Sequence, residues 1–262
     1  MHVFATSFLA LYLAHLVTDF VLQSSRVVAG KRRGSVLAYL EHGGIHFFAG
    51  AFFLGFAVPG LWSNLGFYGV LCALTLVHLG IDWCKIRAVR SRKVADGAAA
   101  FFADQGVHFL TVCLAAWWIA RPFAASLMAK ILWFQSGIEK PLLLFVVYIG
   151  VIFGGGYVVR YLTKPLVKRN AEVVGETTNE LENAGMYIGW LERFLVLTSL
   201  ILQSPATVGL ILTAKSIARY PELKSVRFAE YFLIGTLLSV SLGILGGLLL
   251  LKAFHGTVTL GK

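Results

Sequence analysis

Long apolar segments recur along the whole 262-residue chain, and they constrain its fold more than any other feature. A helix that crosses a bilayer needs about 20 predominantly apolar residues, and about eight segments approach or reach that length. We expect membrane spans at about 3–24, 36–58, 61–84, 98–121, 141–162, 186–203, 205–218 and 228–252. The sequence therefore predicts an all-α, polytopic transmembrane bundle.

The composition excludes an ordinary soluble domain. Hydrophobic residues make up 58% of the chain and charged residues 14%, with a mean hydropathy of +0.77. The formal charge of +10 suits a nucleic-acid-binding protein, but the basic residues lie in short turns between apolar segments. We expect membrane lipid around the protein and no nucleic-acid partner. The three isolated cysteines form neither a CxxC metal motif nor a disulfide framework.

Charge in the connections predicts the topology. The turns after the first, third, fifth and seventh spans are rich in Lys and Arg, whereas the connection through Ser63 and Asn64 is uncharged. Lys and Arg are retained on the cytoplasmic side, so we expect a multi-pass protein of the bacterial cytoplasmic (inner) membrane with both termini outside. The first segment lacks a small-residue cleavage pattern and is expected to stay as a span. Spans six and seven can instead form a re-entrant hairpin, which leaves six spans.

An acidic stretch at 172–182 is the longest polar segment and the best boundary between two halves. We divide the chain into a four-helix core at 1–122, a connecting region with the fifth span at 123–185, and a C-terminal helical half at 186–262. The C-terminal half has its own polar residues, Glu192, Arg193, Lys215 and Glu230. They are expected to pair between helices or to bind substrate, and not to ligate metal.

Five of the seven histidines fall in four pairs with four-residue spacing. The pairs lie in the motifs HLVTDFVLQ, EHGGIH, HLGID and DQGVH: His15 and Asp19, His42 and His46, His78 and Asp82, Asp104 and His108. Residues four apart share one helical face. All four pairs also fall roughly 5 to 15 Å below the cytoplasmic surface at 1.5 Å rise per residue.

These pairs predict a metal site inside the first four spans. Short connections make those spans antiparallel neighbours, and ionisable groups in a bilayer face the protein interior. Eight ligands exceed the three or four of one zinc site and suit two divalent ions. Zinc is the first choice, with manganese or iron as alternatives. Gln23 and Gln105 are expected to support the ligands by hydrogen bonds. A proton or hydrogen-bond relay and purely structural bonding remain the alternatives.

The same motifs resemble the bacterial membrane family described as a domain of unknown function, DUF3307. They cover roughly residues 10–110, and the segments IGWLERFL, AKSIARYPEL and AEYFLIGTLLS resemble the C-terminal part of longer members. The resemblance implies a membrane protein and no particular activity, so the metal prediction rests on spacing and depth.

A metal near the cytoplasmic face can activate water and polarise a phosphoryl or carbonyl oxygen. Our leading hypothesis is a metal-dependent hydrolase for a small or lipid-linked anionic substrate, with catalytic roles for Asp19, Asp82 and Asp104. Gln23, Arg32, Arg33 and Arg87 are the candidate substrate-binding residues, although positive-inside bias also accounts for these arginines. The alternatives are a metal or proton transporter and a di-iron membrane oxidase or hydroxylase. The sequence does not indicate an oligomeric state.

Overall fold

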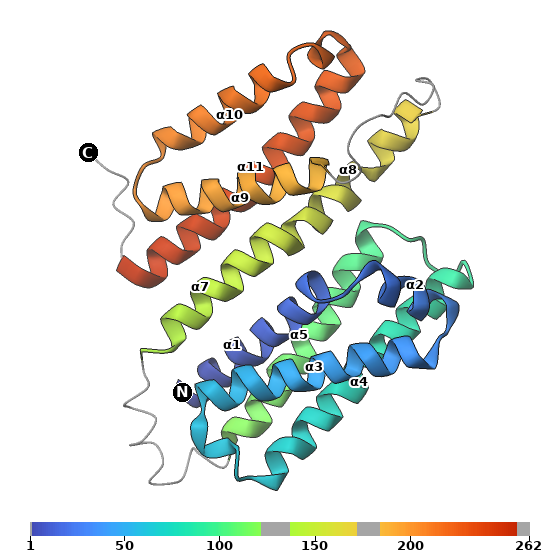
Figure 1. Ribbon diagram of the computed structural model, residues 1–262, viewed down its shortest axis with the longest axis vertical. Helices are drawn as coiled ribbons and strands as arrows, with labels where there is room; N and C mark the ends of the chain where they lie inside the picture. Colours follow the sequence, from blue (N-terminus) through green and yellow to red (C-terminus); the bar gives the residue numbers. More distant parts are fainter. Residues whose placement is uncertain (1, 122–136, 172–183, 256–262) are drawn as a thin grey trace. The chain divides into compact units, whose positions relative to one another are not determined.

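The computed structural model describes residues 2–121, 137–171 and 184–255 (Figure 1). Every regular element in these ranges is a helix, which confirms the predicted all-α fold. The chain forms two compact units, Met1–Val146 and Val147–Lys262, and the boundary falls inside one helix. The predicted division into three regions stays a prediction.

The first unit is a four-helix bundle. Its main helices are α1 (His2–Leu16), α3 (Val36–Ala57), α4 (Leu65–Arg90) and α5 (Ala98–Ala120). Helix α1 packs against α3 and α5, and α4 packs against the same two helices, so the four form a closed ring. Consecutive bundle helices run antiparallel, as their short connections require (Figure 1).

Three shorter elements and the start of another helix complete this unit. They are the π-helix η1 (Val17–Val21), α2 (Ser25–Arg33), the 3₁₀ turn η2 (Pro59–Leu61) and the first part of α7 (Glu139–Ile149). The π-helix continues α1 and contains Asp19. Single π-helical turns inside α-helices occur frequently at functional sites.

Helix α2 occupies the stretch predicted to be the basic turn after the first span. Ser24 caps its N-terminus by accepting a hydrogen bond from the Val27 amide at 3.3 Å. Gly34 ends it in the left-handed conformation, with φ of 81°, which glycine adopts without steric cost. A Cβ added to Gly30 would lie 2.6 Å from the Ala38 Cβ, so α2 and the start of α3 pack with their backbones close together.

The second unit is also helical. It contains the end of α7, the π-helix η4 (Gly150–Gly154), α8 (Gly155–Ala171), α9 (Ala184–Ile201), α10 (Ala206–Ala218), η5 (Glu222–Lys224) and α11 (Val226–His255). Helix α11 packs on α8 and α9, and α10 packs on α9. Gly243, Gly246 and Gly247 bring α11 close to α9, because their positions face the side chains of Val196, Leu197 and Leu200.

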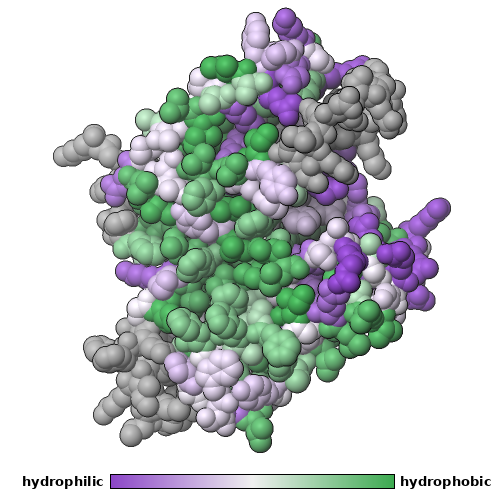
Figure 2. All heavy atoms as spheres, viewed as in Figure 1, coloured by the Kyte–Doolittle hydropathy of each residue, from purple (hydrophilic) through white to green (hydrophobic). Residues whose placement is uncertain are grey.

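Five helical segments in the described residues are long and apolar enough to cross a membrane: Val3–Val21, Leu65–Arg90, Ala98–Ala120, Glu139–Lys164 and Val226–Phe254. Helix α3 is not among them; Glu41, His42 and His46 lower its hydropathy. The expected total of about eight spans stays a prediction. Large apolar side chains such as Phe48, Phe52 and Phe56 are exposed on α3, and apolar residues cover much of the surface in Figure 2.

Candidate metal centre

The bundle brings the eight predicted ligand residues together in its interior. They come in pairs from its four helices: His15 and Asp19 from α1 and η1, His42 and His46 from α3, His78 and Asp82 from α4, Asp104 and His108 from α5. Seven of the eight are buried, and the Asp19 side chain keeps an exposed fraction of 10%. We call these eight residues the His/Asp cluster. It is a desolvated polar centre inside an otherwise apolar bundle.

The closest contacts in the cluster join the ends of four side chains. The Nε2 atoms of His42 and His78 are 2.9 Å apart. Asp19 Oδ1 lies 3.4 Å from each of these two nitrogens. Asp82 Oδ2 lies 3.5 Å from His42 Nε2 and 3.9 Å from His78 Nε2. Two imidazole nitrogens and two carboxylate oxygens thus converge on one point.

Other polar groups orient the histidine rings. His108 Nδ1 donates to the backbone carbonyl of Asp104 at 2.9 Å, which directs its Nε2 away from that carbonyl. His46 Nδ1 lies 3.3 Å from the Thr75 hydroxyl. His15 Nε2 lies 3.4 Å from the Gln105 side-chain oxygen, in agreement with the supporting role predicted for this glutamine. Metal-binding histidines usually have such a partner on the ring nitrogen that faces away from the metal.

Several atoms of the cluster are buried without a hydrogen bond. Among the described residues, eight buried side-chain atoms make none, and five of these belong to the cluster: His15 Nδ1, Asp19 Oδ1, His78 Nδ1, Asp104 Oδ1 and His108 Nε2. A buried polar atom without a partner costs about 1–3 kcal/mol. Imidazole nitrogens and carboxylate oxygens are the donors that zinc, manganese and iron accept, so the residues present fit a divalent metal.

His78 is central to the cluster. In the part of the chain that the structure describes, three groups of ligand atoms, each with all members within 4.8 Å of one another, could hold a metal: His15–His46–His78, Asp19–His42–His78 and His78–Asp82–His108. His78 is common to all three. Its ring also stacks on His46 with centroids 4.2 Å apart.

Residues 7–134 match the model of a family described as a protein of unknown function, DUF3307. This range contains all four motifs and all eight residues of the cluster. Residues 7–134 are a DUF3307 domain. The match confirms the resemblance drawn from the motifs. No curated protein and no solved structure matches the chain.

Two lysines of the DUF3307 domain extend the cluster, and neither is among the site residues predicted from the sequence. Lys31 on α2 is only 4% exposed, and its Nζ lies 2.5 Å from Asp82 Oδ2. Lys85 on α4 donates to Asp104 Oδ2 at 2.8 Å. A helical interpretation of 25–33 could have found Lys31, because it follows Val27 by four residues on the buried face of α2.

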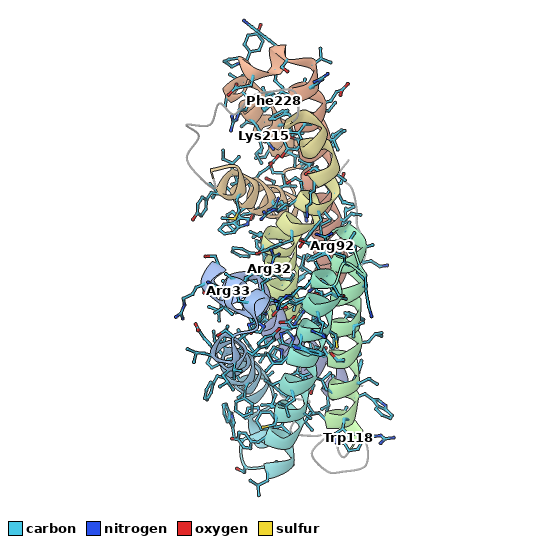
Figure 3. The ribbon with its side chains drawn as sticks, turned by 90° about the vertical axis from the view of Figure 1, so that its right-hand side faces the viewer. Arg32, Arg33, Arg92, Trp118, Lys215 and Phe228 are labelled. Carbon is cyan, nitrogen blue, oxygen red and sulfur yellow. The ribbon has the colours of Figure 1, made fainter. Side chains whose placement is uncertain are left out.

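The predicted substrate-binding residues of the DUF3307 domain separate into two groups. The Gln23 side-chain amide lies 3.2 Å from His42 Nδ1, at the edge of the cluster. Arg32, Arg33 and Arg87 are exposed, and Figure 3 labels the first two on α2. Arg32 lies 3.8 Å from Asp96, and Arg87 lies against the Trp83 ring. The structure does not bring these three arginines to the cluster.

Three of the four polar residues predicted for the second unit pair between helices, and the fourth, Glu230, is exposed. Lys215 donates to the buried Glu192 at 2.7 Å. The guanidinium of Arg193 donates to the Ile152 carbonyl of η4 at 3.0 and 2.7 Å and to the Ser239 hydroxyl at 3.1 Å. These contacts tie α9 to α10, η4 and α11.

Proposed function

We propose that this chain is an integral membrane protein whose DUF3307 domain binds one divalent metal ion through Asp19, His42 and His78 and hydrolyses an anionic, amphiphilic substrate. One observation supports the metal most strongly. The three ligand atoms are 2.9, 3.4 and 3.4 Å apart, and the edges of a tetrahedron around zinc, with ligands at 2.0–2.2 Å, measure about 3.3–3.6 Å. The three side chains thus already have nearly the spacing of zinc ligands.

The charge of the cluster favours one ion over the two that the ligand count suggested. Its three aspartates and the ammonium groups of Lys31 and Lys85 carry a formal charge of −1 with neutral histidines. One divalent ion raises this charge to about +1 and two raise it to about +3, and uncompensated charge in a membrane interior is costly. A single ion with one anionic ligand leaves the centre neutral.

Asp82 is the candidate general base. Its Oδ2 lies within 3.5–3.9 Å of the two histidine nitrogens, beside the three-ligand set rather than in it. There the carboxylate can accept a proton from a water molecule that approaches the substrate. A bound divalent ion would supply Lewis acidity at this point. Asp104 lies beside His108 rather than beside His42 and His78, so we assign it a supporting role.

The position of the cluster along the helices supports a substrate that reaches the membrane surface. His42 and Asp104 lie six residues after the starts of α3 and α5, and Asp82 lies eight residues before the end of α4. At 1.5 Å rise per residue these separations are about 9–12 Å. The same end of the bundle carries the basic residues that predict the cytoplasmic side. The membrane placement and the topology are part of the proposal.

Metal transport is the second candidate, because the cluster is buried and α1 gives way to the π-helix η1, which contains Asp19. Transporters place their sites where helices depart from regular α-helical geometry. Metal flux into proteoliposomes that contain the purified protein, without hydrolysis of any lipid substrate, would favour transport.

The test of hydrolysis uses the purified full-length protein in mixed micelles with fluorescent phosphate-ester lipids. We expect product release that stops with a chelator and resumes with zinc or manganese. Asp82→Asn should retain the metal and lose activity by a factor on the order of 10²–10⁴, the usual contribution of general base catalysis. Glu192→Gln, in the second unit, is the control and should retain activity. Metal-independent activity, or full activity in Asp82→Asn, would contradict the proposal.

A further inference from the structure

Lys31 is a buried cation that points into the His/Asp cluster from outside the four-helix ring. It is 4% exposed, and its ammonium group contacts Asp82 Oδ2. The same oxygen lies 3.5 Å from His42 Nε2. The ammonium group therefore lies next to the point where the proposed ligands converge, on the side of the candidate general base.

The packing of α2 fixes Lys31 in this position. Val27, one turn earlier on the same face, is 1% exposed. Gly30 allows α2 to approach Ala38 of α3, and Gly34 turns the chain directly after the helix. Burial of a long, charged side chain is rare unless the charge is paired. Burial of the Lys31 ammonium group costs free energy of desolvation, and the group lies beside a polar centre. It is therefore a candidate for binding substrate.

Lys85 has a different environment and provides a comparison. Its side chain is 29% exposed, and it contacts Asp104 Oδ2, which also accepts a hydrogen bond from Gln105. Its ammonium group lies 5.9 Å from the centroid of the Phe101 ring. Lys85 thus neutralises the Asp104 carboxylate at the edge of the cluster. Lys31 instead contacts the Asp82 carboxylate, which also lies next to the proposed ligand His42.

We propose that Lys31 is a substrate-binding residue, and that its partner is the anionic oxygen of a phosphodiester. This inference rests on the proposed function. Ammonium groups and metal ions that flank one phosphoryl group stabilise the charge that develops during its transfer. The charge of the centre selects a singly charged group, because the cluster with one divalent ion carries about +1. Lys31 replaces the exposed Arg32, Arg33 and Arg87 in this role.

The experiment measures metal content and phosphodiester binding on the same samples of full-length protein in detergent. Metal is measured by elemental analysis, and binding by ³¹P NMR titration of the zinc-loaded protein with dimethyl phosphate. Uncharged trimethyl phosphate is the matched ligand control. The variants are Lys31→Met, the conservative Lys31→Arg, and, as the lysine control outside the cluster, Lys252→Met on α11.

We expect wild type and Lys252→Met to bind dimethyl phosphate and not trimethyl phosphate. Lys31→Met should retain the metal and bind dimethyl phosphate more weakly by a factor on the order of 10 to 100, the effect of one charged hydrogen bond. Lys31→Arg should recover most of the affinity. Phosphatidylglycerol in mixed micelles, a diester with acyl chains, forms a second arm. If phosphatidylglycerol binds more tightly than dimethyl phosphate, the natural ligand is a phosphodiester carried by a lipid. If the two bind equally, the natural ligand is a water-soluble diester.

The two proposals fail in different ways. Wild-type protein without metal overturns the proposed function, and this inference with it. Metal-loaded wild type that does not bind dimethyl phosphate overturns the inference alone, as does Lys31→Met that binds it with wild-type affinity. If Lys31→Met loses the metal while Lys31→Arg keeps the wild-type metal content, Lys31 supports the metal ligands. That result also overturns its role in substrate binding.

Discussion

Single side chains in the DUF3307 domain show which atoms of the His/Asp cluster have hydrogen-bond partners without a metal and which do not. His46 has Thr75 beside one ring nitrogen, and His108 donates to a backbone carbonyl through Nδ1 while its Nε2 is buried without a hydrogen bond. Asp19 Oδ1 is also buried without a hydrogen bond, and it lies 3.4 Å from the Nε2 nitrogens of both His42 and His78. At the residue scale these three residues are therefore the best placed to share one cation.

This difference gives a prediction for individual variants. His42→Ala should lower the metal affinity by more than about 100-fold, because even partners of metal ligands contribute 10- to 100-fold. His46→Ala should remain within about tenfold of wild type, because it belongs only to an alternative group with His15 and His78. Competition with a chromophoric zinc chelator measures both affinities. The reverse order would place the ion at His15, His46 and His78.

At the scale of elements, the sequence predicted most of the long helices well. The length of the apolar segments predicted helices over 36–58 and 98–121, and the structure has helices at Val36–Ala57 and Ala98–Ala120. The four-residue spacing also predicted which faces point inward. Helix α2 was missed, because nine residues with several basic side chains carry no apolar signal. The contact between Lys31 and Asp82 joins residues 51 positions apart, and no local pattern contains it.

The close approach of α2 to α3 can be tested at Gly30. Gly30→Ala places a Cβ 2.6 Å from the Ala38 Cβ, a short side chain that cannot move without its backbone. We expect a loss of about 1–3 kcal/mol in the free energy of unfolding, as in other overpacked sites. Gly44→Ala is the matched control, because nothing lies within 4 Å of its added Cβ. It should be neutral or stabilising by up to about 1 kcal/mol. Equal stability of both variants in denaturant titrations would contradict the close packing.

At the scale of the whole molecule, the first unit has a polar cluster within an apolar core, and many large apolar side chains on its exterior. Phe52, Phe56 and Leu76 are exposed, whereas the aspartates and histidines of the cluster face inward. Such a distribution suits helices surrounded by lipid, where ionisable groups avoid the hydrocarbon. The second unit contributes two further segments long enough to cross a membrane, one of which begins in the first unit. The total number of spans and the orientation remain predictions, because length and charge bias are the only signals for them.

The metal content of the purified full-length protein tests the central claim most directly. We expect about one zinc or manganese ion per chain in wild type, because Asp19, His42 and His78 form one ligand set and the charge of the cluster favours a single ion. His78→Ala should retain less than about a tenth of this content, because His78 belongs to all three ligand groups. His255→Ala, at the end of α11, is the histidine control and should match wild type. Wild-type protein without stoichiometric metal, or His78→Ala with a full complement, would contradict the account.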